Sequence, residues 1–298
     1  MKQVDLHVHS TKSDGTFTPK ALVDYALQKG LAAFALTDHD TIDGLSEALS
    51  YAEDKPVEVV PGIEFSTEYE KKDVHVVGLY IRYDAPAFSS KLQSFVDSRI
   101  QRNIKMCRNL QGAGIDITFE KLCEENPGAV ITRAHYAAYL FNHGYVADRA
   151  EAFAKYVGDD CPYYIPREKV TPAQAVELIL QAGGVPILAH PPLYHMEKEH
   201  LDNLVGKLTE NGLMGIETIY SSYTAQDERD MFRLAKKYDL LPSGGSDFHG
   251  ENKPGLDLGC GYGKLFVPEE MLKNIRNAAD KGCNHENTVY GLRRHITQ

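Results

Sequence analysis

Short apolar runs recur along the first 85 residues of the chain, and helix-type patterns follow the first two of them. The runs that predict strands are residues 4–8, 32–37, 57–66 and 73–81. The last run alternates apolar and polar residues, which favours pairing with the run before it across a turn. A helix is predicted after the first run, because Thr18 suits an N-cap, Pro19 a first helical position and Gly30 a C-terminal stop. A second helix is expected to begin near Thr41.

Helical patterns replace this alternation between residues 86 and 165. The stretches SKLQSFVDSRIQRNIKMCRNLQGAG and ITRAHYAAYLFNHG each predict a helix. Strands and helices alternate again from Thr171 onward. The predicted elements there are a helix at 171–184, strands at 184–190, 215–220 and 240–246, and a last helix at 268–282.

Strand–helix repetition over this length predicts an α/β fold whose parallel sheet is closed, or nearly closed, into a barrel. We interpret the helical stretch as an insertion into that barrel. The expected domains are a barrel of residues 1–85 and 166–298 and a helical insertion of residues 86–165, in which we expect substrate recognition to lie.

Composition narrows the classes of function. The chain is 43% hydrophobic and 25% charged, as is usual for a globular protein, and its apolar runs are too short for a transmembrane helix. The net charge of −10 disfavours a long nucleic-acid groove, which needs a basic surface, and we expect no membrane partner. Five dispersed cysteines without a CxxC pair favour reduced thiols. Since the first residues also lack a signal-peptide pattern, we expect a cytoplasmic protein.

Two histidines close the first predicted strand. His7 and His9 are two residues apart and should point the same way, where two imidazoles can bind one metal ion. Asp5 should share their face and could orient a ligand histidine as a hydrogen-bond acceptor. The alternative is a pair of exposed histidines on an edge strand.

Further imidazoles and carboxylates stand at the ends of most other predicted strands. They are Asp14, Asp38, His39, Asp40, Glu64, His75, His190, Asp247 and His249. Each alone has a structural explanation, such as a turn, a helix cap, a solvated carboxylate or a core histidine. Taken together they favour a metal site, because the carboxyl ends of barrel strands are where such sites are built.

The motifs DLHVHS, SDG, TDHD, PGIE, DVHVVGLY, AHP and SDFHG resemble those of the PHP (polymerase and histidinol phosphatase) phosphoesterases. The resemblance implies a distorted barrel of about seven strands, of (β/α)7 type, that holds two to three divalent ions: Mn²⁺, Fe²⁺ or Zn²⁺. It implies three ligand groups: His7, His9, Glu64 and Asp247; Glu64, His75 and His190 with Glu64 bridging; and Asp14, His39 and His249. Asp38 and Asp40 would be supporting or capping residues.

Two motifs in the predicted insertion suggest a phosphate contact. RIQRN places Arg99, Arg102 and Asn103 on one helix face, and ITRAH contains Arg133 and His135. Arginine matches phosphate oxygens with a rigid fork, although a solvated helix face is the alternative.

The pattern RxxRN followed by TRxH resembles the branch of 3′,5′-nucleoside bisphosphate phosphatases and 5′-3′ exoribonucleases. In that branch the insertion arginines would grip the phosphate that is not cleaved. A lysine that often follows a Val-Pro pair there is replaced here by IPREKV, which leaves the roles of Arg167, Glu168 and Lys169 open.

The chemistry implied is hydrolysis of a phosphomonoester by a metal-activated water, with no protein nucleophile. Three divalent ions and three carboxylates would give a local charge of about +3, which attracts phosphate despite the negative surface. The substrate would be small, a nucleotide or short oligonucleotide. The alternatives are a histidinol phosphate phosphatase, an amidohydrolase, whose bridging lysine on the fourth strand is replaced here by His75, and a non-catalytic metal-binding module. The sequence does not fix the oligomeric state.

Overall fold

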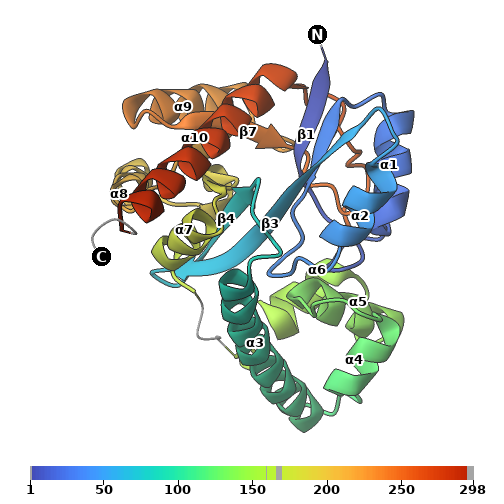
Figure 1. Ribbon diagram of the computed structural model, residues 1–298. Helices are drawn as coiled ribbons and strands as arrows, with labels where there is room; N and C mark the ends of the chain where they lie inside the picture. Colours follow the sequence, from blue (N-terminus) through green and yellow to red (C-terminus); the bar gives the residue numbers. More distant parts are fainter. Residues whose placement is uncertain (1, 159, 166–169, 294–298) are drawn as a thin grey trace.

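The computed structural model describes residues 2–158, 160–165 and 170–293, and its centre is an eight-stranded sheet (Figure 1). The strands are β1 (Gln3–Val8), β2 (Ala33–Leu36), β3 (Glu58–Tyr69), β4 (Lys72–Leu79), β5 (Val185–Leu188), β6 (Gly215–Tyr220), β7 (Leu241–Gly245) and β8 (Val267–Pro268). Their order in the sheet is β7-β6-β5-β4-β3-β2-β1-β8. The predicted α/β class is confirmed.

The sheet is nearly closed, because the chain just after β7 returns to β1. The backbone N–H of Asp247 donates to the carbonyl of His7 at 2.8 Å, and that of His9 donates to the carbonyl of Phe248 at 3.0 Å. This close approach needs glycine at the end of β7, since a Cβ at Gly245 would lie 2.4 Å from that of His7. The ends of the first and seventh strands are thereby joined.

Two strands depart from the parallel arrangement expected for the sheet: the short edge strand β8 pairs antiparallel with β1, and β4 is antiparallel to both of its neighbours. β4 pairs antiparallel with both β3 and β5, whereas β1–β2, β2–β3, β5–β6 and β6–β7 are parallel. The predicted turn joins β3 to β4 at Glu70 and Lys71, both of which have positive φ. Because β4 runs the opposite way, its beginning lies at the rim where the parallel strands end. His75, near that beginning, is therefore on the same rim as the other predicted ligands.

Helices pack around the sheet and bury its apolar side chains. They are α1 (Pro19–Gln28), α2 (Leu45–Ala52), α7 (Pro172–Gln181), α8 (Lys198–Glu210), α9 (Ala225–Lys237) and α10 (Glu269–Arg293). Thr18, Thr171 and Thr224 cap α1, α7 and α9 through their side chains. Two predicted boundaries were wrong. Residues 41–44 form a turn, in which Asp43 N–H bonds the Thr41 hydroxyl, so α2 begins at Leu45. The last helix continues beyond residue 282 to Arg293.

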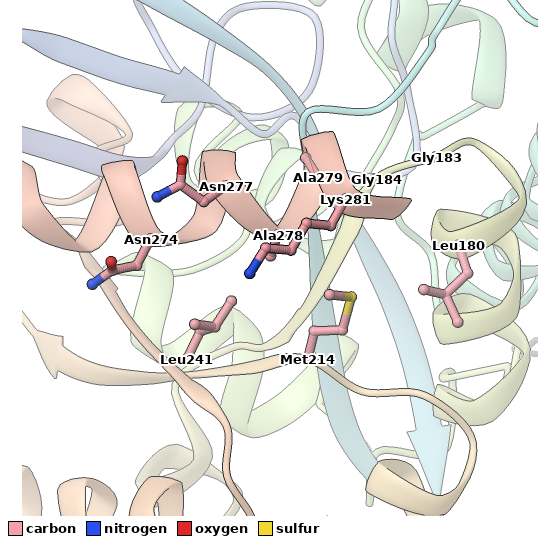
Figure 2. A pocket seen from close by; sticks show the side chains of 10 residues that line it. All are labelled: Leu180, Gly183, Gly184, Met214, Leu241, Asn274, Asn277, Ala278, Ala279 and Lys281. Atoms are coloured by element: carbon pink, nitrogen blue, oxygen red, sulfur yellow. The ribbon is translucent and has the colours of Figure 1, made fainter. Parts of the chain in front are cut away.

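A second apolar cluster joins the strands to α10. Leu272 and Ile275 of α10 pack with Val4, Leu6 and Ile187 from the strands. Beside this helix lies a cavity of about 540 Å³ (Figure 2), lined mainly by apolar groups such as Met214 and Leu241, with Asn274, Asn277 and Lys281 of the helix. None of the predicted site residues lines this cavity.

Residues 86–157 are helical and have an apolar core of their own, separate from those of the barrel. The elements are α3 (Pro86–Gly112), α4 (Phe119–Glu125), α5 (Arg133–Asn142), α6 (Arg149–Ala152) and a π-helical turn η1 (Phe153–Val157). Figure 1 shows them grouped on one side of the sheet, with α3 extending away from it. Two further short 3-10 turns are η2 (Pro191–Tyr194) and η3 (Gly250–Asn252).

The structure can be checked for membrane-spanning helices and for disulfides. Among the described residues, no helix is long and apolar enough to cross a membrane. Cys107, Cys123, Cys161 and Cys260 are free thiols.

Candidate metal centre

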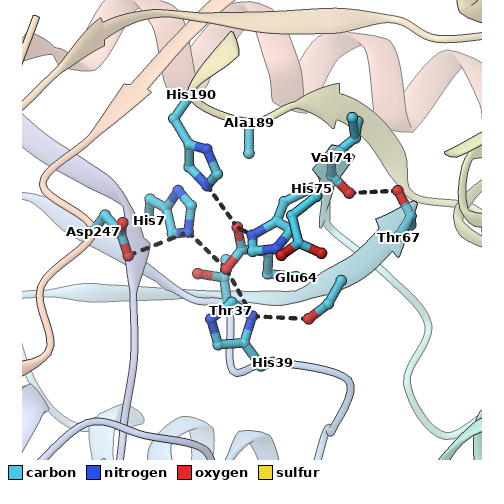
Figure 3. Close-up of polar contacts among 12 residues, drawn as sticks. His7, Thr37, His39, Glu64, Thr67, Val74, His75, Ala189, His190 and Asp247 are labelled. Atoms are coloured by element: carbon cyan, nitrogen blue, oxygen red, sulfur yellow. Dashed lines mark hydrogen bonds and ion pairs between the residues drawn. The ribbon is translucent and has the colours of Figure 1, made fainter. Parts of the chain in front are cut away.

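The nine predicted ligand side chains come together at one end of the barrel. Figure 3 shows His7, His39, Glu64, His75, His190 and Asp247 of this set. Each comes from a strand or from the loop just after one: His7, His9 and Asp14 from β1 and its loop, His39 after β2, Glu64 from β3, His75 from β4, His190 after β5, and Asp247 and His249 after β7. Most are fully buried, and His39 and His75 are partly exposed. Strand ends far apart in the sequence therefore supply one site.

The carboxylate of Glu64 lies at the centre of this cluster. Five imidazole nitrogens surround its two oxygens at 2.9–3.2 Å. They belong to His7, His9 and His39 around Oε2, and to His75 and His190 around Oε1. A carboxylate whose two oxygens face separate groups of imidazoles has the arrangement of a bridging metal ligand.

Two aspartates complete the cluster. Oδ1 of Asp14 lies 3.1 Å from Nε2 of His249. Oδ1 of Asp247 lies 3.3 Å from Nε2 of His9 and 3.2 Å from Nδ1 of His249. Both aspartates thus face His249, and Asp247 also shares His9 with Glu64.

The ligand atoms converge in four overlapping groups, each within 4.8 Å. The groups are His9, Asp14, His39 and His249; His7, Glu64 and His190; His7, His9 and Asp247; and His39, Glu64 and His75. The grouping differs in detail from the predicted one, because His75 converges with His39 and His190 with His7. The assignment of residues to individual ions stays a prediction.

Several of these buried atoms have no hydrogen-bond partner among the described residues. They include Nε2 of His7 and of His9, Oδ1 of Asp14 and Oε2 of Glu64. A buried polar atom left without a partner typically costs about 1–3 kcal/mol. Once deprotonated, each of these atoms offers a lone pair to a divalent cation, so the nitrogen and carboxylate oxygen donors here fit divalent metal ions.

Electrostatics keep the three carboxylates ionised. Burial would raise the pKa of the Glu64 carboxyl, but His7 and His39 hold it well below its usual range. Burial would also raise the pKa of Asp14, but His249 holds it well below its usual range. At Asp247, Lys253 and His249 lower the pKa in the same way, against the effect of burial. The site therefore offers three anionic ligands at neutral pH.

Glu217, which the sequence analysis missed, supports two of the histidines. Its Oε1 lies 2.9 Å from Nδ1 of His7, and its Oε2 accepts from the backbone N–H of His190 at 2.7 Å. An ionised Glu217 can only accept from Nδ1–H of His7, so that Nε2 is the nitrogen of His7 that faces the cluster. A lone glutamate inside the apolar strand GIETIY was the available signal.

Asp5 accepts from a predicted ligand histidine, but through the backbone: its Oδ1 lies 3.4 Å from the backbone N of His7, which donates to it. The carboxylate also accepts from Ser246 and from the backbone N–H of Gly259 at 2.8 Å, and it ties the loops after β7 to β1. Asp5 therefore holds the backbone that carries His7.

Two further residues that were not predicted contact the second oxygen of Asp247. The Tyr220 hydroxyl donates to Oδ2, and the Lys253 ammonium pairs with the same oxygen. These contacts leave Oδ1 facing the histidines. Nearby, Asp38 accepts three hydrogen bonds at 2.6–2.8 Å from Ser10 and Ser13 and so holds the loop after β1.

A cavity of about 200 Å³ opens beside the cluster and is lined from both the barrel and the helical segment. Barrel residues in its wall include Asp14, His39, Ser66, Asp73 and His75. The helical segment supplies Arg99, Arg102, Thr132, Arg133, Ala134 and Phe153, and Tyr164 follows it. Three of the five predicted substrate contacts therefore lie in the wall.

The other two predicted contacts have supporting positions. Asn103 donates to the carbonyl of Ile131 at 3.1 Å, and His135 accepts from the backbone N–H of Thr132 at 2.9 Å. Both hold the segment that presents Arg133. Their contact with substrate stays a prediction, and Arg167 and Lys169 lie outside the described residues.

A nearly closed α/β barrel with a buried histidine–carboxylate cluster beside an arginine-lined cavity defines a metal-dependent phosphoesterase. A model of the PHP domain matches residues 5–240. The chain belongs to this family, as its motifs predicted.

Named relatives agree with this class. The chain is 35% identical over 262 residues to a 3′,5′-nucleoside bisphosphate phosphatase from Chromobacterium violaceum, which covers 87% of this chain and 91% of that protein. It is 37% identical over 274 residues to a 5′-3′ exoribonuclease from Haemophilus influenzae, which covers 92% and 97%. A solved structure from Bifidobacterium adolescentis, assigned as a metal-dependent phosphoesterase, superposes with a TM-score of 0.82 at 28% identity over 93% of this chain and 96% of that one. The chain is therefore a phosphoric ester hydrolase, and these relatives give no support to the histidinol phosphate alternative.

Metal binding should release protons and strengthen as pH rises. Burial would lower the pKa of His9, but the carboxylates of Asp247 and Glu64, which lie 3.3 and 3.2 Å from its Nε2, raise it to about 9. A metal ion must displace that proton, so affinity for Mn²⁺ should rise roughly tenfold per unit between pH 6.5 and 8.5. Calorimetric titration in buffers of different ionisation enthalpy counts the protons. A His143→Gln variant, changed at a half-exposed histidine just after α5, should release as many protons as the parent. A pH-independent affinity would contradict the prediction.

Glu217→Gln should weaken metal binding by about 10- to 100-fold. The amide cannot accept from both His7 and the His190 backbone, so one ligand loses its orientation. Competition with a chromophoric chelator measures the affinity, and circular dichroism checks the fold. Glu210→Gln, at an exposed residue at the end of α8, is the matched control. Equal affinity in the two variants would show that Glu217 does not position the ligands.

Proposed function

We propose that this protein removes the 3′-phosphate from nucleoside 3′,5′-bisphosphates, and that short 5′-phosphorylated RNA is its second candidate substrate. The proposed metal ligands are His7, His9, Asp14, His39, Glu64, His75, His190, Asp247 and His249, with two to three ions of Mn²⁺, Fe²⁺ or Zn²⁺. Bound divalent ions would supply an activated water and neutralise the leaving oxygen.

The observation that carries the proposal is the shared cavity wall. Asp14, His39 and His75 of the cluster and three arginines of the helical segment line one space. A phosphate held at the cluster therefore leaves room for a second anion beside the arginines. This favours a substrate with two phosphates over a simple phosphomonoester. The names of the Chromobacterium and Haemophilus relatives support the same substrate classes.

Ion pairs hold two of the arginines at the cavity. Arg99 pairs with Asp40, and both are buried. Arg133 pairs with Asp73 at a partly exposed site. Carboxylates that fix a guanidinium in place reduce the rotamer freedom it must lose when it binds phosphate. The proposed insertion domain, residues 86–165, would thus recognise the uncleaved phosphate.

Substrate preference can be measured directly with the Mn²⁺-loaded protein. We expect phosphate release from adenosine 3′,5′-bisphosphate to exceed that from AMP, histidinol phosphate and a 5′-phosphorylated trinucleotide. His7→Ala should abolish release because it removes a proposed ligand, whereas His200→Ala, at a partly exposed histidine on α8, should not. Preference for the trinucleotide would point to RNA end trimming, and preference for histidinol phosphate would overturn the two-phosphate proposal.

Arg133→Gln should remove the advantage that the second phosphate gives. A lost hydrogen bond to a charged group corresponds to roughly 10- to 150-fold in kcat/KM for the bisphosphate, while hydrolysis of the 3′-monophosphate should change little. The ratio of the two rates isolates the effect from any damage to the cluster. Arg108→Gln, at an exposed position on α3, serves as the control. A ratio equal to that of the parent would exclude Arg133 from phosphate recognition.

A further inference from the structure

Two aromatic side chains in the cavity wall are not used by the phosphate contacts described above. Phe153 lines the cavity and remains 39% exposed, and Tyr164, which packs partly against the helical core, lines it too. The other lining residues are mostly charged or polar. An exposed phenyl ring in such a place leaves apolar area in water and offers a flat π-face to a ligand.

The backbone around Phe153 is specialised. Phe153 begins the π-helical turn η1, and π-turns are rare and occur frequently at functional sites. Its carbonyl accepts from the backbone N–H of Gly158 at 3.0 Å and from the Cys161 thiol at 3.4 Å. A Cβ at Gly158 would lie 2.4 Å from that carbonyl oxygen, so glycine is required for this turn.

Backbone hydrogen bonds connect the end of this turn to Tyr164. Cys161 N–H donates to the Gly158 carbonyl at 3.0 Å, and Tyr164 N–H donates to the Cys161 carbonyl at 3.1 Å. The guanidinium carbon of Arg133 lies 5.5 Å from the centre of the Tyr164 ring. The aromatic surface is therefore continuous with an arginine proposed to bind phosphate.

We infer that Phe153 and Tyr164 form a stacking surface for the nucleobase of the substrate. The inference rests on the proposed function, which puts one phosphate at the cluster and the other at the arginines. A nucleoside joins its base to those phosphates through one ribose, so a base can reach an aromatic group in the same cavity wall. Every base has a π-face, so this surface requires a base but tolerates any of them.

The test compares substrates with and without a base. Phe153→Leu removes the ring and keeps an apolar side chain, while Phe153→Tyr keeps the ring. With the Mn²⁺-loaded protein we expect Phe153→Leu to lower kcat/KM for adenosine 3′,5′-bisphosphate by about 5- to 100-fold, chiefly through KM. The abasic analogue, 1-deoxyribose 3,5-bisphosphate, should be hydrolysed by the variant and the parent at the same rate, and Phe153→Tyr should resemble the parent. Phe141→Leu, at an exposed phenylalanine of α5 that does not line the cavity, is the matched control.

A binding measurement separates failure of this inference from failure of the proposed function. The parent should bind AMP more tightly than ribose 5-phosphate in calorimetric titrations, and Phe153→Leu should lose that difference. This result would support the stacking surface even if neither bisphosphate were hydrolysed. Equal binding of the two ligands by the parent, or a difference that survives in Phe153→Leu, would overturn it while leaving the bisphosphatase proposal intact. An equal loss of activity on the abasic analogue would also overturn it.

Discussion

The buried carboxylate of Glu64 is the interaction on which this end of the molecule depends. It is 1% exposed and stands among five imidazoles contributed by β1, β4 and the loops after β1, β2 and β5. An isolated buried carboxylate would be neutral, because burial opposes its charge. The surrounding nitrogens keep it ionised, and a divalent cation would do so more effectively than protons. The barrel therefore brings histidines from strands that are distant in sequence to the two carboxylate oxygens of Glu64.

That convergence constrains the backbone at the strand ends. His190 and Asp247 adopt positive φ just after β5 and β7, and Asp40 does so two residues after Asp38. Such conformations cost non-glycine residues of order 1–3 kcal/mol each and cluster at functional sites. Gly245 adds the close approach that brings Asp247 to His7. The strained backbone at these residues lowers stability locally, and it directs side chains such as His190 and Asp247 into the cluster around Glu64.

The convergence of the nine predicted ligands could be predicted because its signal in the sequence is local. A histidine or carboxylate at the end of an apolar run marks a strand terminus whatever its neighbours are, and HVH, TDHD and SDFH each contain that mark. Glu217 and Lys253 lack such a mark, since their contacts with His7 and Asp247 exist only after the sheet closes. The contacts of Asp5 with Ser246 and Gly259 likewise exist only after the loops that follow β7 have returned to β1. Phe153 lies in a stretch predicted to be helical, and nothing in the sequence marks it; its place in the cavity wall follows only from the fold.

The helical segment is coupled to the cluster through the loop that carries Asp14. The Thr132 hydroxyl donates to Oδ2 of Asp14 at 3.1 Å, and the backbone of Val130 bonds that of Lys12 at 3.0 Å. From the other side, the Asn252 amide donates to the carbonyl of Asp14 and accepts from Arg149 of α6, both at 2.7 Å. One loop therefore both holds a proposed metal ligand and contacts the residues just before Arg133. In our proposal substrate recognition and metal binding would share that loop, because the helical segment lines the cavity and is bonded to Asp14.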